Sequence, residues 1–482
     1  MTKNALLRSV LTAASAGALL LPLLGPAQAA GAVDRAGGAE PADSAVYVVQ
    51  LLRTDADQQA VDKAARQLVA DDGGQLRRTY YAALQGFSVT LTDAQVGAYL
   101  KDTRVGSVTR DRTYRTAGRL GARPYRAAPG TGVGAGGRWA APWGLDRMDQ
   151  RDLPLDGRFS APNPAAGVHA YVVDTGVRAD HEELRGRVTA AYDAINDRAG
   201  GLATDCNGHG TATASLVAGK HTGVASAARV GSVRALGCDG TGRLEHLVSA
   251  VDWITAHAAK PAVVSLGFSG EPGSVLDLQL YEMAAQGIAY TAPAGNGDGN
   301  GRPIDACDAT PGRQTTALTV SATDRSDRRL ASANTGSCVH LFAPGSGIPV
   351  ASSVGDRYYT QLSGTSAAAA QVAGAAASYL ADHPGTPAEE LDAALARRAT
   401  KDHVCDPGEE SKNLLAYVGP DTGRAPYAAA GASGVTAEVG ETDAPSAPGV
   451  SSAPGVSDAA GVGSARAAGR GGAADAGAGA GR

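Results

Sequence analysis

The sequence has little net charge, and beyond its first residues it has no long hydrophobic run. The formal net charge is −5 over 482 residues, which gives no general reason to expect a nucleic acid or an anionic membrane as a partner. No stretch after residue 29 supplies the roughly 20 strongly apolar residues of a membrane-spanning helix. We therefore expect no nucleic acid partner, and no membrane contact once the N-terminus is removed. The hydrophobic content of 43% is ample for a large core in two or more units.

Cysteine is scarce, and its number is odd. The five cysteines are Cys206, Cys238, Cys307, Cys338 and Cys405. Cysteines of an exported chain tend to pair, and an odd number leaves one over. The sequence alone allows many pairings. A bridge that closes a loop of about 30 residues would stabilise the fold by about 3 to 4 kcal/mol in the chain-entropy treatment of disulfides.

The first 29 residues have the composition of a secretory signal peptide. Lys3 and Arg8 precede an apolar segment over residues 13–24, and the small residues Ala-Gln-Ala at 27–29 form a suitable cleavage point. The alternative interpretation is an N-terminal membrane anchor. We predict a signal peptide at 1–29 and a secreted, extracellular product.

Residues 46–115 read as a small α+β unit. A strand, a helix, a second strand, a second helix and a closing strand follow one another, which is the order of a ferredoxin-like fold. Gly73-Gly74 breaks the chain after the first helix. The strands are expected at 46–51, before and through 86–91, and at 105–108, and the helices at 57–69 and 92–100.

Two segments have compositions that do not favour folding. Residues 116–138 are rich in Gly, Ala, Pro and Arg, and residues 420–482 are rich in Gly, Ala, Ser and Pro. Such segments cannot bury enough apolar surface to order themselves. We predict an exposed linker at 116–138, within which the precursor is cut at a position that the sequence leaves open, and a disordered tail at 420–482.

Residues 139–419 alternate apolar strands with helices. Unbroken apolar strands are typical of a parallel sheet that helices cover on both faces, so we predict an α/β fold here. In such sheets, functional sites gather at the carboxyl ends of the strands. The strands are expected at 168–173, 229–236, 262–266, 288–292 and 317–322, and the helices at 210–218, 243–258, 275–285 and from Ser366 onward.

Three short motifs stand where such a sheet would place its chemistry. Asp174 directly follows an expected strand in the motif Asp-Thr-Gly, and His209 and Ser366 each begin an expected helix, in the motifs His-Gly-Thr and Gly-Thr-Ser. Singly, these motifs have structural explanations as a turn, a helix start and an N-cap. Together, in the order Asp, His, Ser, they match one of the chain orders of Ser-His-Asp hydrolases.

Over residues 46–415 the sequence resembles a secreted subtilisin-like serine protease (subtilase) of the proteinase K branch. Besides the three motifs, the resemblance rests on the segments APWGLDR (141–147), DCNGH (205–209), LGCDGTG (236–242), AGN (294–296), DAC (305–307) and GSC (336–338). Segments 80–91 and 102–111 resemble an inhibitor-type propeptide, which would assign that role to residues 46–115. The resemblance implies the disulfides Cys206–Cys238 and Cys307–Cys338.

The resemblance also implies a role for each site residue. Ser366 would attack a peptide carbonyl while His209 takes its proton, since the ordinary pKa of a histidine lies near 6.5. Asp174 would orient the imidazole and stabilise the imidazolium. Asn296 and the Ser366 N–H would donate to the oxyanion. Two segments would flank an extended peptide and bind its backbone, namely Gly240-Thr241-Gly242 and Ser265-Leu266-Gly267.

Several positions depart from the family pattern. Phe268 replaces a glycine, and it either narrows the pocket for the residue before the scissile bond or is a surface aromatic. His340 stands where the branch has a calcium-binding carboxylate. Because an imidazole is a poor ligand for calcium, we assign no metal residues and expect no cofactor, although weaker calcium sites elsewhere stay open. Other departures, expected to alter packing around the catalytic helices, are Ala212, Pro293, Ala367, Ala370 and Gln371.

These observations together predict a secreted serine endopeptidase that hydrolyses proteins or peptides through an acyl-enzyme intermediate. We expect a monomer that is made as a self-processing zymogen, with the propeptide as its chaperone and intramolecular inhibitor. A second hypothesis is a catalytically weak relative that serves as an exported binding protein. It is motivated by the altered residues on the catalytic helices.

Overall fold

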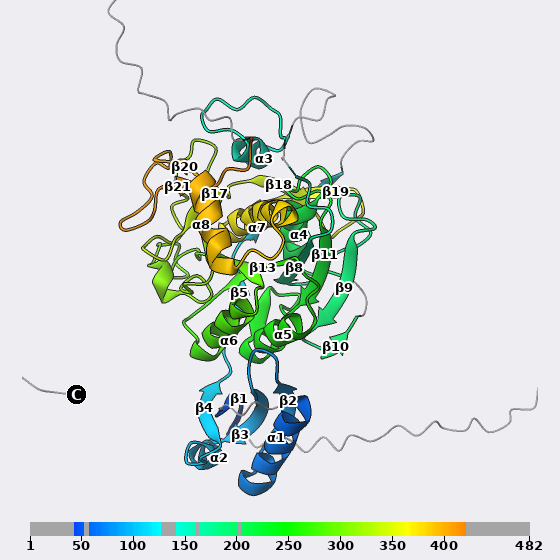
Figure 1. Cartoon of the computed structure of the whole chain (residues 1–482), viewed down its shortest axis with the longest axis vertical. Helices are drawn as coiled ribbons and strands as arrows, with labels where there is room; N and C mark the ends of the chain where they lie inside the picture. Colours follow the sequence, from blue (N-terminus) through cyan, green and yellow to red (C-terminus); the bar gives the residue numbers. More distant parts are fainter. Residues whose placement is uncertain (1–42, 53–56, 127–140, 161–162, 201–203, 421–482) are drawn as a thin grey trace, which may run out of the picture. The chain divides into compact units, whose positions relative to one another are not determined.

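The structure, a computed structural model, describes residues 43–52, 57–126, 141–160, 163–200 and 204–420 (Figure 1). The predicted signal peptide, most of the predicted linker and nearly all of the predicted tail lie outside these residues. Within the described part of the chain, no helix is both long and apolar enough to cross a membrane.

The N-terminal unit is a four-stranded antiparallel sheet with two helices. The strand order is β2-β3-β1-β4, and every neighbouring pair in it is antiparallel. Asp57 caps the first helix by accepting a hydrogen bond from the Ala60 N–H at 2.9 Å. The predicted ferredoxin-like unit is confirmed, with one strand, β2, that the sequence did not separate from β3. The elements are β1 (Ser44–Leu51), α1 (Gln58–Asp72), β2 (Gln75–Tyr80), β3 (Gly86–Thr92), α2 (Asp93–Tyr99) and β4 (Val105–Arg110).

The C-terminal part is built on a ten-stranded sheet with the order β10-β9-β11-β8-β13-β15-β16-β17-β21-β20. Its inner strands are parallel, and the two edge pairs are antiparallel. The predicted parallel α/β sheet is confirmed. Its strands are β8 (His169–Asp174), β9 (Val188–Asp193), β10 (Arg198–Ala199), β11 (Arg229–Arg234), β13 (Ala262–Leu266), β15 (Ala289–Pro293), β16 (Leu318–Thr323), β17 (Leu341–Pro344), β20 (Thr400–Lys401) and β21 (Leu414–Leu415).

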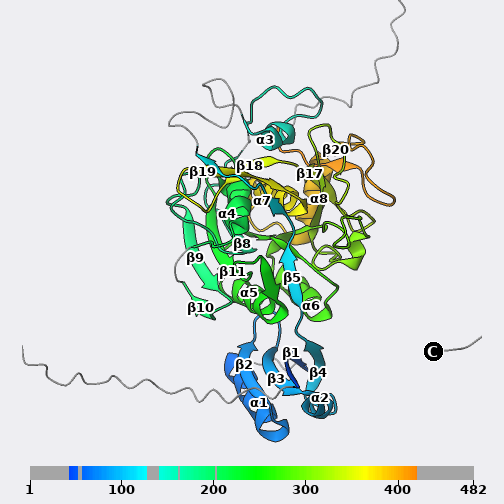
Figure 2. The same ribbon diagram turned by 180° about the vertical axis from the view of Figure 1, so that it is seen from behind.

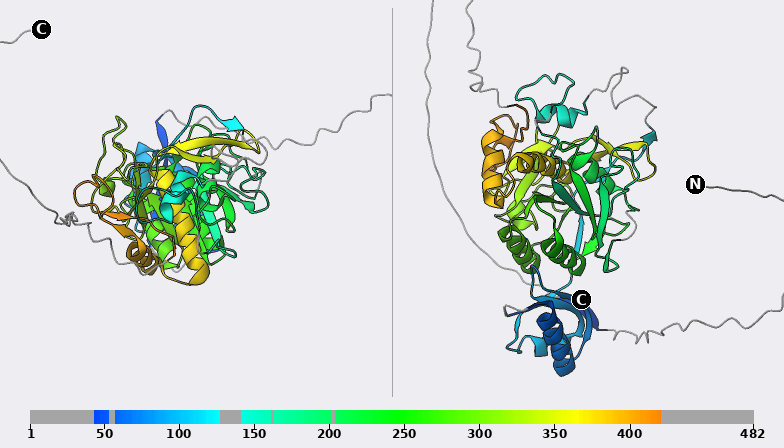
Figure 3. Two further views of the ribbon diagram at one scale, coloured as in Figure 1. Left: turned by 90° about the horizontal axis from the view of Figure 1, so that it is seen from above. Right: turned by 45° about the vertical axis from the view of Figure 1, so that its right-hand side comes forward.

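Helices cover both faces of this sheet, which explains why its central strands β13, β15 and β16 are buried along their whole length. Helices α4 and α7 pack side by side against one face, and α5 and α6 pack side by side on the other. Figure 2 and Figure 3 show the two layers from behind and from further directions. The helices are α3 (Trp143–Met148), α4 (His209–Ala218), α5 (Leu244–His257), α6 (Ser274–Ala285), α7 (Thr365–Asp382) and α8 (Ala388–Arg398).

Two small antiparallel sheets join the start of the predicted linker to the C-terminal part of the chain. One has the strand order β12-β5-β14, and in the other β19 pairs with β18, β6 and β7. Residues 116–126 therefore lie along paired strands and Ala117 is buried, while residues 121–126 are exposed as the predicted linker would be. The composition argument considered only side chains, whereas main-chain pairing orders this segment. The strands are β5 (Thr113–Thr116), β6 (Arg119–Leu120), β7 (Tyr125–Arg126), β12 (Thr241–Arg243), β14 (Phe268–Ser269), β18 (Ile348–Ala351) and β19 (Tyr358–Ser363).

Candidate active site

Asp174 is the last residue of β8, so its carboxylate leaves the sheet at the carboxyl end of a central strand. The side chain is fully buried. It accepts hydrogen bonds from the Thr175 N–H at 2.7 Å and from the Thr213 hydroxyl at 3.1 Å. These donors fix the carboxylate in one orientation and offset the cost of burying its charge.

His209 is the first residue of α4, and its ring lies between Asp174 and Ser366. Its Nδ1 is 2.9 Å from each carboxylate oxygen of Asp174, and its Nε2 is 2.9 Å from Ser366 Oγ. The loop before the helix is held by Asp205, whose carboxylate accepts hydrogen bonds from the Gly208 N–H at 2.7 Å and the Thr211 N–H at 2.8 Å. The three residues predicted from separate motifs are thus within hydrogen-bonding distance of one another.

Ser366 is the second residue of α7, and Gly364 shapes the turn that presents it. Gly364 has a φ of 131°, a conformation that residues with a side chain rarely adopt. A Cβ at this position would also lie 2.7 Å from the carbonyl oxygen of Ala117. The glycine of the Gly-Thr-Ser motif is therefore required both for the turn and for the close approach of another chain segment.

The carbonyl of Ala117 points at two hydrogen-bond donors beside the serine. The Asn296 side-chain amide donates to the Ala117 oxygen at 2.7 Å, and the Ser366 N–H donates to the same oxygen at 3.0 Å. These are the two oxyanion donors that the sequence predicted. Preorganised donors of this kind stabilise the negative charge that develops on a carbonyl oxygen under nucleophilic attack.

Gly118 follows with its backbone against the serine. A Cβ at this position would lie 2.4 Å from Ser366 Oγ and 3.0 Å from His209 Nε2. The residue after Ala117 therefore has no room for a side chain in this arrangement. The Ala117–Gly118 peptide bond occupies the space where a substrate bond would lie. The sequence did not single out this bond, although the pair Ala-Gly directly after the ordered unit was a usable signal.

The residues before Ala117 lie as a strand between two segments of the C-terminal part. β5 pairs antiparallel with β12 on one side and with β14 on the other. The Thr116 N–H donates to the Gly240 carbonyl at 2.9 Å, and the Ala117 N–H donates to the Gly267 carbonyl at 3.0 Å. The structure therefore places four of the six predicted peptide-binding residues against this strand, namely Gly240, Thr241, Gly242 and Gly267.

The other two predicted peptide-binding residues, Ser265 and Leu266, lie inside the central sheet. Ser265 is paired with strands on both sides, and Leu266 is paired with β8. Because strand β13 already uses its backbone groups there, the pairing with β5 passes to Phe268 and Ser269 beyond it. The structure shows no pairing of β5 with Ser265 or Leu266, and their part in holding the peptide stays a prediction.

Phe268 is fully buried, so the interpretation as a surface aromatic is wrong. Its ring packs edge-on against Tyr114 with the centroids 5.9 Å apart. Burial raises the pKa of Tyr114 to about 12. The pair forms an aromatic contact three residues before Ala117, and the sequence did not single out Tyr114 because the last strand of the unit was expected at 105–108.

The departures from the family pattern on the catalytic helices are accommodated by close packing. Ala212, Ala367, Ala370 and Gln371 are fully buried. The Gln371 amide donates to the Pro344 carbonyl at 2.5 Å. These positions therefore leave the three site residues in hydrogen-bonding geometry.

Two disulfides brace the loops around the site. Cys206 is bonded to Cys238, which joins the loop before His209 to the loop before β12. Cys307 is bonded to Cys338. Both pairs are those that the sequence resemblance implied, and Cys405 has an exposed free thiol.

The described residues hold no group of three or more His, Cys, Asp or Glu side chains arranged for a metal ion. His340 faces Asp392, with Nδ1 3.4 Å from the carboxylate.

Comparison with known families gives two matches. Residues 166–423 match the subtilase family, and residues 40–117 match the peptidase inhibitor I9 family. The second match ends at Ala117, the residue whose carbonyl lies between Asn296 and Ser366.

Individual proteins are similar over most of the chain. It is 37% identical to an extracellular serine proteinase of Thermus sp. (strain Rt41A), over 74% of this chain and 82% of that protein. It is 35% identical to alkaline serine exoprotease A of Vibrio alginolyticus, over 73% of this chain and 62% of that protein. The crystal structure of a cold adapted subtilisin-like serine proteinase is similar with a TM-score of 0.55 and 40% identity, over 58% of this chain and all of that chain.

Proposed function

The chain belongs to the subtilase family of serine endopeptidases, and from this premise we propose that it is a zymogen that cuts its own Ala117–Gly118 bond. One observation carries the proposal. The Ala117 carbonyl oxygen accepts hydrogen bonds from Asn296 at 2.7 Å and from the Ser366 N–H at 3.0 Å, beside the Ser366 hydroxyl. The inhibitor match that ends at residue 117 supports the same boundary.

The proposed reaction follows from these distances. Ser366 Oγ attacks the Ala117 carbonyl carbon while its proton passes to His209 Nε2, 2.9 Å away. The oxygen becomes negative and is stabilised by the donors from Asn296 and Ser366. The bond to the Gly118 nitrogen then breaks, and His209 returns its proton to that nitrogen. Water hydrolyses the acyl-enzyme by the same route, which leaves a carboxylate on Ala117 and an amine on Gly118. Asp174 accepts the Nδ1–H throughout, so that Nε2 is the basic nitrogen.

The same site would act on other polypeptides in an extended conformation once the propeptide leaves. Main-chain pairing with β12 and β14 recognises backbone rather than sequence, while the buried contact between Tyr114 and Phe268 favours an aromatic residue at the fourth position before the cut bond. The signal-like sequence at 1–29 and the name of the extracellular Thermus relative support secretion of this chain as well.

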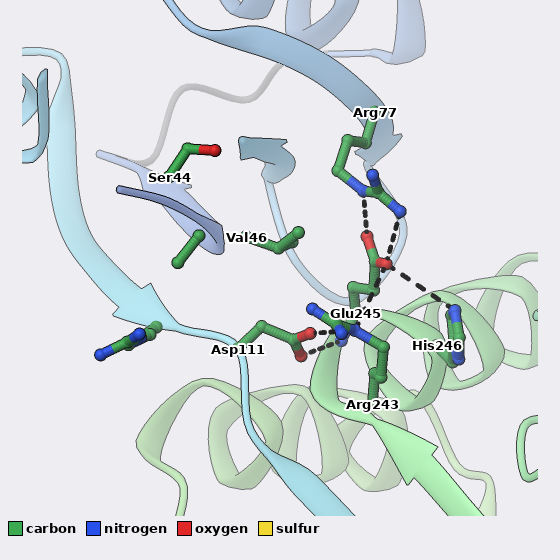
Figure 4. Close-up of a pocket in the computed structure, with 9 residues that line it drawn as sticks. Ser44, Val46, Arg77, Asp111, Arg243, Glu245 and His246 are labelled. Carbon is green, nitrogen blue, oxygen red and sulfur yellow. Dashed lines mark hydrogen bonds and ion pairs between the residues drawn. The ribbon is translucent and has the colours of Figure 1, made fainter. Parts of the chain in front are cut away.

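After the cut, contacts between the propeptide and α5 would keep the propeptide bound as an inhibitor. The Asp252 carboxylate accepts hydrogen bonds from four consecutive N–H groups of residues 81–84, at distances from 2.8 to 3.3 Å. Arg77 forms a two-pronged ion pair with the buried Glu245, at 2.8 and 2.9 Å. Figure 4 shows Arg77 pointing at Glu245, with His246 beyond it and Arg243 directed at Asp111.

This interface is expected to weaken in acid. Burial lowers the pKa of His246 to about 4, and the cations of Arg78, Arg243 and Arg77 lower it as well, against the attraction of Glu245. Arg77 and Arg78 belong to the propeptide, so when it leaves, the pKa of His246 returns toward 6.5. The separated state then binds more protons, and the complex weakens as the pH falls through this window.

Glu245 also makes the complex between the propeptide and α5 weaker in acid. Burial alone would raise its pKa, but the pair with Arg77 holds the pKa below its usual range, and this stabilisation is lost when acid protonates the carboxylate. We expect the dissociation constant of the cut propeptide to rise from pH 8 to pH 4.5 through His246. Gel filtration of the cut complex, with the serine blocked by a sulfonyl fluoride, measures this without relying on activity.

His246→Gln should flatten this pH dependence, and His257→Gln, a change to an exposed histidine on the same helix, should keep it. An equally steep pH dependence in His246→Gln would show that other groups control the release.

The proposed function is tested on the purified full-length chain. We expect one fragment that ends at Ala117, a second that begins at Gly118, and hydrolysis of casein after the propeptide is released. Intact mass and N-terminal sequencing identify the cut. A chain that stays whole and does not hydrolyse casein would instead support the exported binding protein.

A further inference from the structure

The chain beyond Gly118 continues along β19 instead of leaving the cleft. Arg119 and Leu120 pair antiparallel with Ser363 and Leu362. We call residues 119–126 the strap. Within the strap, the Gly121 N–H donates to the Gln361 carbonyl at 2.8 Å, and the Gly121 carbonyl accepts from the Thr360 hydroxyl at 3.1 Å.

The far end of the strap has an aromatic contact. Tyr125, the eighth residue after Ala117, pairs with Tyr359, and their rings stack with centroids 6.3 Å apart at an angle of 27°. The Tyr359 ring is fixed on its far side, because its hydroxyl oxygen lies 2.9 Å from a carboxylate oxygen of Glu182 and 2.8 Å from one of Glu183, and its one proton bonds to this pair. The stacking surface is therefore a rigid part of the peptidase fold.

We propose that β19 is a binding edge for the extended polypeptide on the leaving-group side of the cut bond, with Tyr359 as an aromatic subsite, and that the strap stays on this edge after cleavage. The proposal rests on the proposed cut at Ala117–Gly118. None of the strap contacts named above involves Ala117 or Gly118, so breaking the bond between them leaves these contacts in place.

A retained strap has a consequence for activity. It is covalently attached to the peptidase part, so it competes with added substrate at the high effective concentration of a tethered ligand. A substrate that ends at the cut bond avoids the edge, whereas a long peptide that extends eight or more residues beyond the cut bond needs it. Full activity on long chains then requires a second cut downstream of Arg126.

The test uses the full-length precursor and variants at the exposed end of the strap. Tyr125→Ala removes the stacking ring, Tyr125→Phe keeps it, and Arg123→Ala changes a neighbouring exposed residue as the matched control. After the propeptide is released, KM is measured on the species that begins at Gly118. One substrate is a short peptide anilide that ends at the cut bond, and the other is a peptide extending ten residues beyond it.

We expect Tyr125→Ala to lower KM for the long peptide by roughly three- to tenfold, the range of one aromatic contact, and to leave KM for the anilide unchanged. Tyr125→Phe and Arg123→Ala should match the unmodified chain. Equal KM values for the long peptide in all four proteins would overturn the proposal. So would a product that begins beyond Arg126 at the earliest time, with no species beginning at Gly118. A first cut at another bond would contradict the proposed processing site. The masses of the fragments identify that outcome, whereas the KM values test the strap.

Discussion

The Ser366→Ala variant is expected to remain a single uncut chain and to hydrolyse peptides about 10⁶-fold more slowly, the loss that removal of the serine causes in subtilisin. The reason is local. Ser366 Oγ is the hydroxyl that lies within hydrogen-bonding distance of His209 Nε2, and an alanine offers no atom to form the acyl-enzyme. Asn296 and the Ser366 N–H would still hold the Ala117 carbonyl, so the variant should be trapped as the precursor with its cleft filled. Denaturing gels over time and intact mass measure the cut, and a peptide anilide measures the rate.

Ser378→Ala is the matched control, because it removes one hydroxyl from the other end of the same helix. The Ser378 hydroxyl donates to the Asn163 carbonyl at 2.7 Å, away from the cleft. The control should be cut at the normal rate with a modest loss of stability of about 1 kcal/mol. Cleavage of the Ser366→Ala precursor at Ala117–Gly118 in highly purified protein would rule out Ser366 as the nucleophile for this step.

The sequence predicted the central sheet and the three residues at its rim because their signals are local. Strands such as β13 and β15 are buried on both faces, so they appear as unbroken apolar runs, and the residues at their ends follow directly. Asp174 ends such a strand, and Ser366 begins a helix after a glycine whose backbone conformation favours no other residue. Their convergence on His209 did not follow from the parallel strands alone, because Ser366 comes after β19, which lies in a separate antiparallel sheet.

The occupant of the cleft could not be predicted in the same way. Residues 116–126 have few apolar side chains, and their order comes from backbone groups of β12, β14 and β19 that are remote in sequence. Amino-acid composition does not indicate such pairing, because every residue except proline offers the same N–H and C=O. The pairing of β5 with Phe268 and Ser269, beyond the predicted segment 265–267, has a related cause, since it depends on where strand β13 leaves the central sheet.

Asp174→Asn is expected to lower kcat by about 10⁴-fold with little change in KM, as the same change does in another Ser-His-Asp protease. An asparagine has nearly the same shape, but Thr175 and Thr213 donate to different carboxylate oxygens of Asp174, so the single carbonyl oxygen of the amide can keep only one of these hydrogen bonds. Its NH₂ group then faces His209 Nδ1, which must accept instead of donate. The imidazole proton moves to Nε2, and that nitrogen can no longer take the proton of Ser366.

Asp180→Asn is the control, because it removes the same charge from an exposed carboxylate a few residues further along the chain. The Asp180 carboxylate is paired with Arg178 at 2.8 Å. This variant should keep kcat within a factor of about two, as expected for a surface ion pair. Circular dichroism and the melting temperature check that both variants are folded, and a peptide anilide gives kcat and KM separately. A folded Asp174→Asn protein with kcat reduced less than tenfold would mean that His209 does not depend on Asp174 for its tautomer. In that case the 2.9 Å contacts between them would serve only to position the ring.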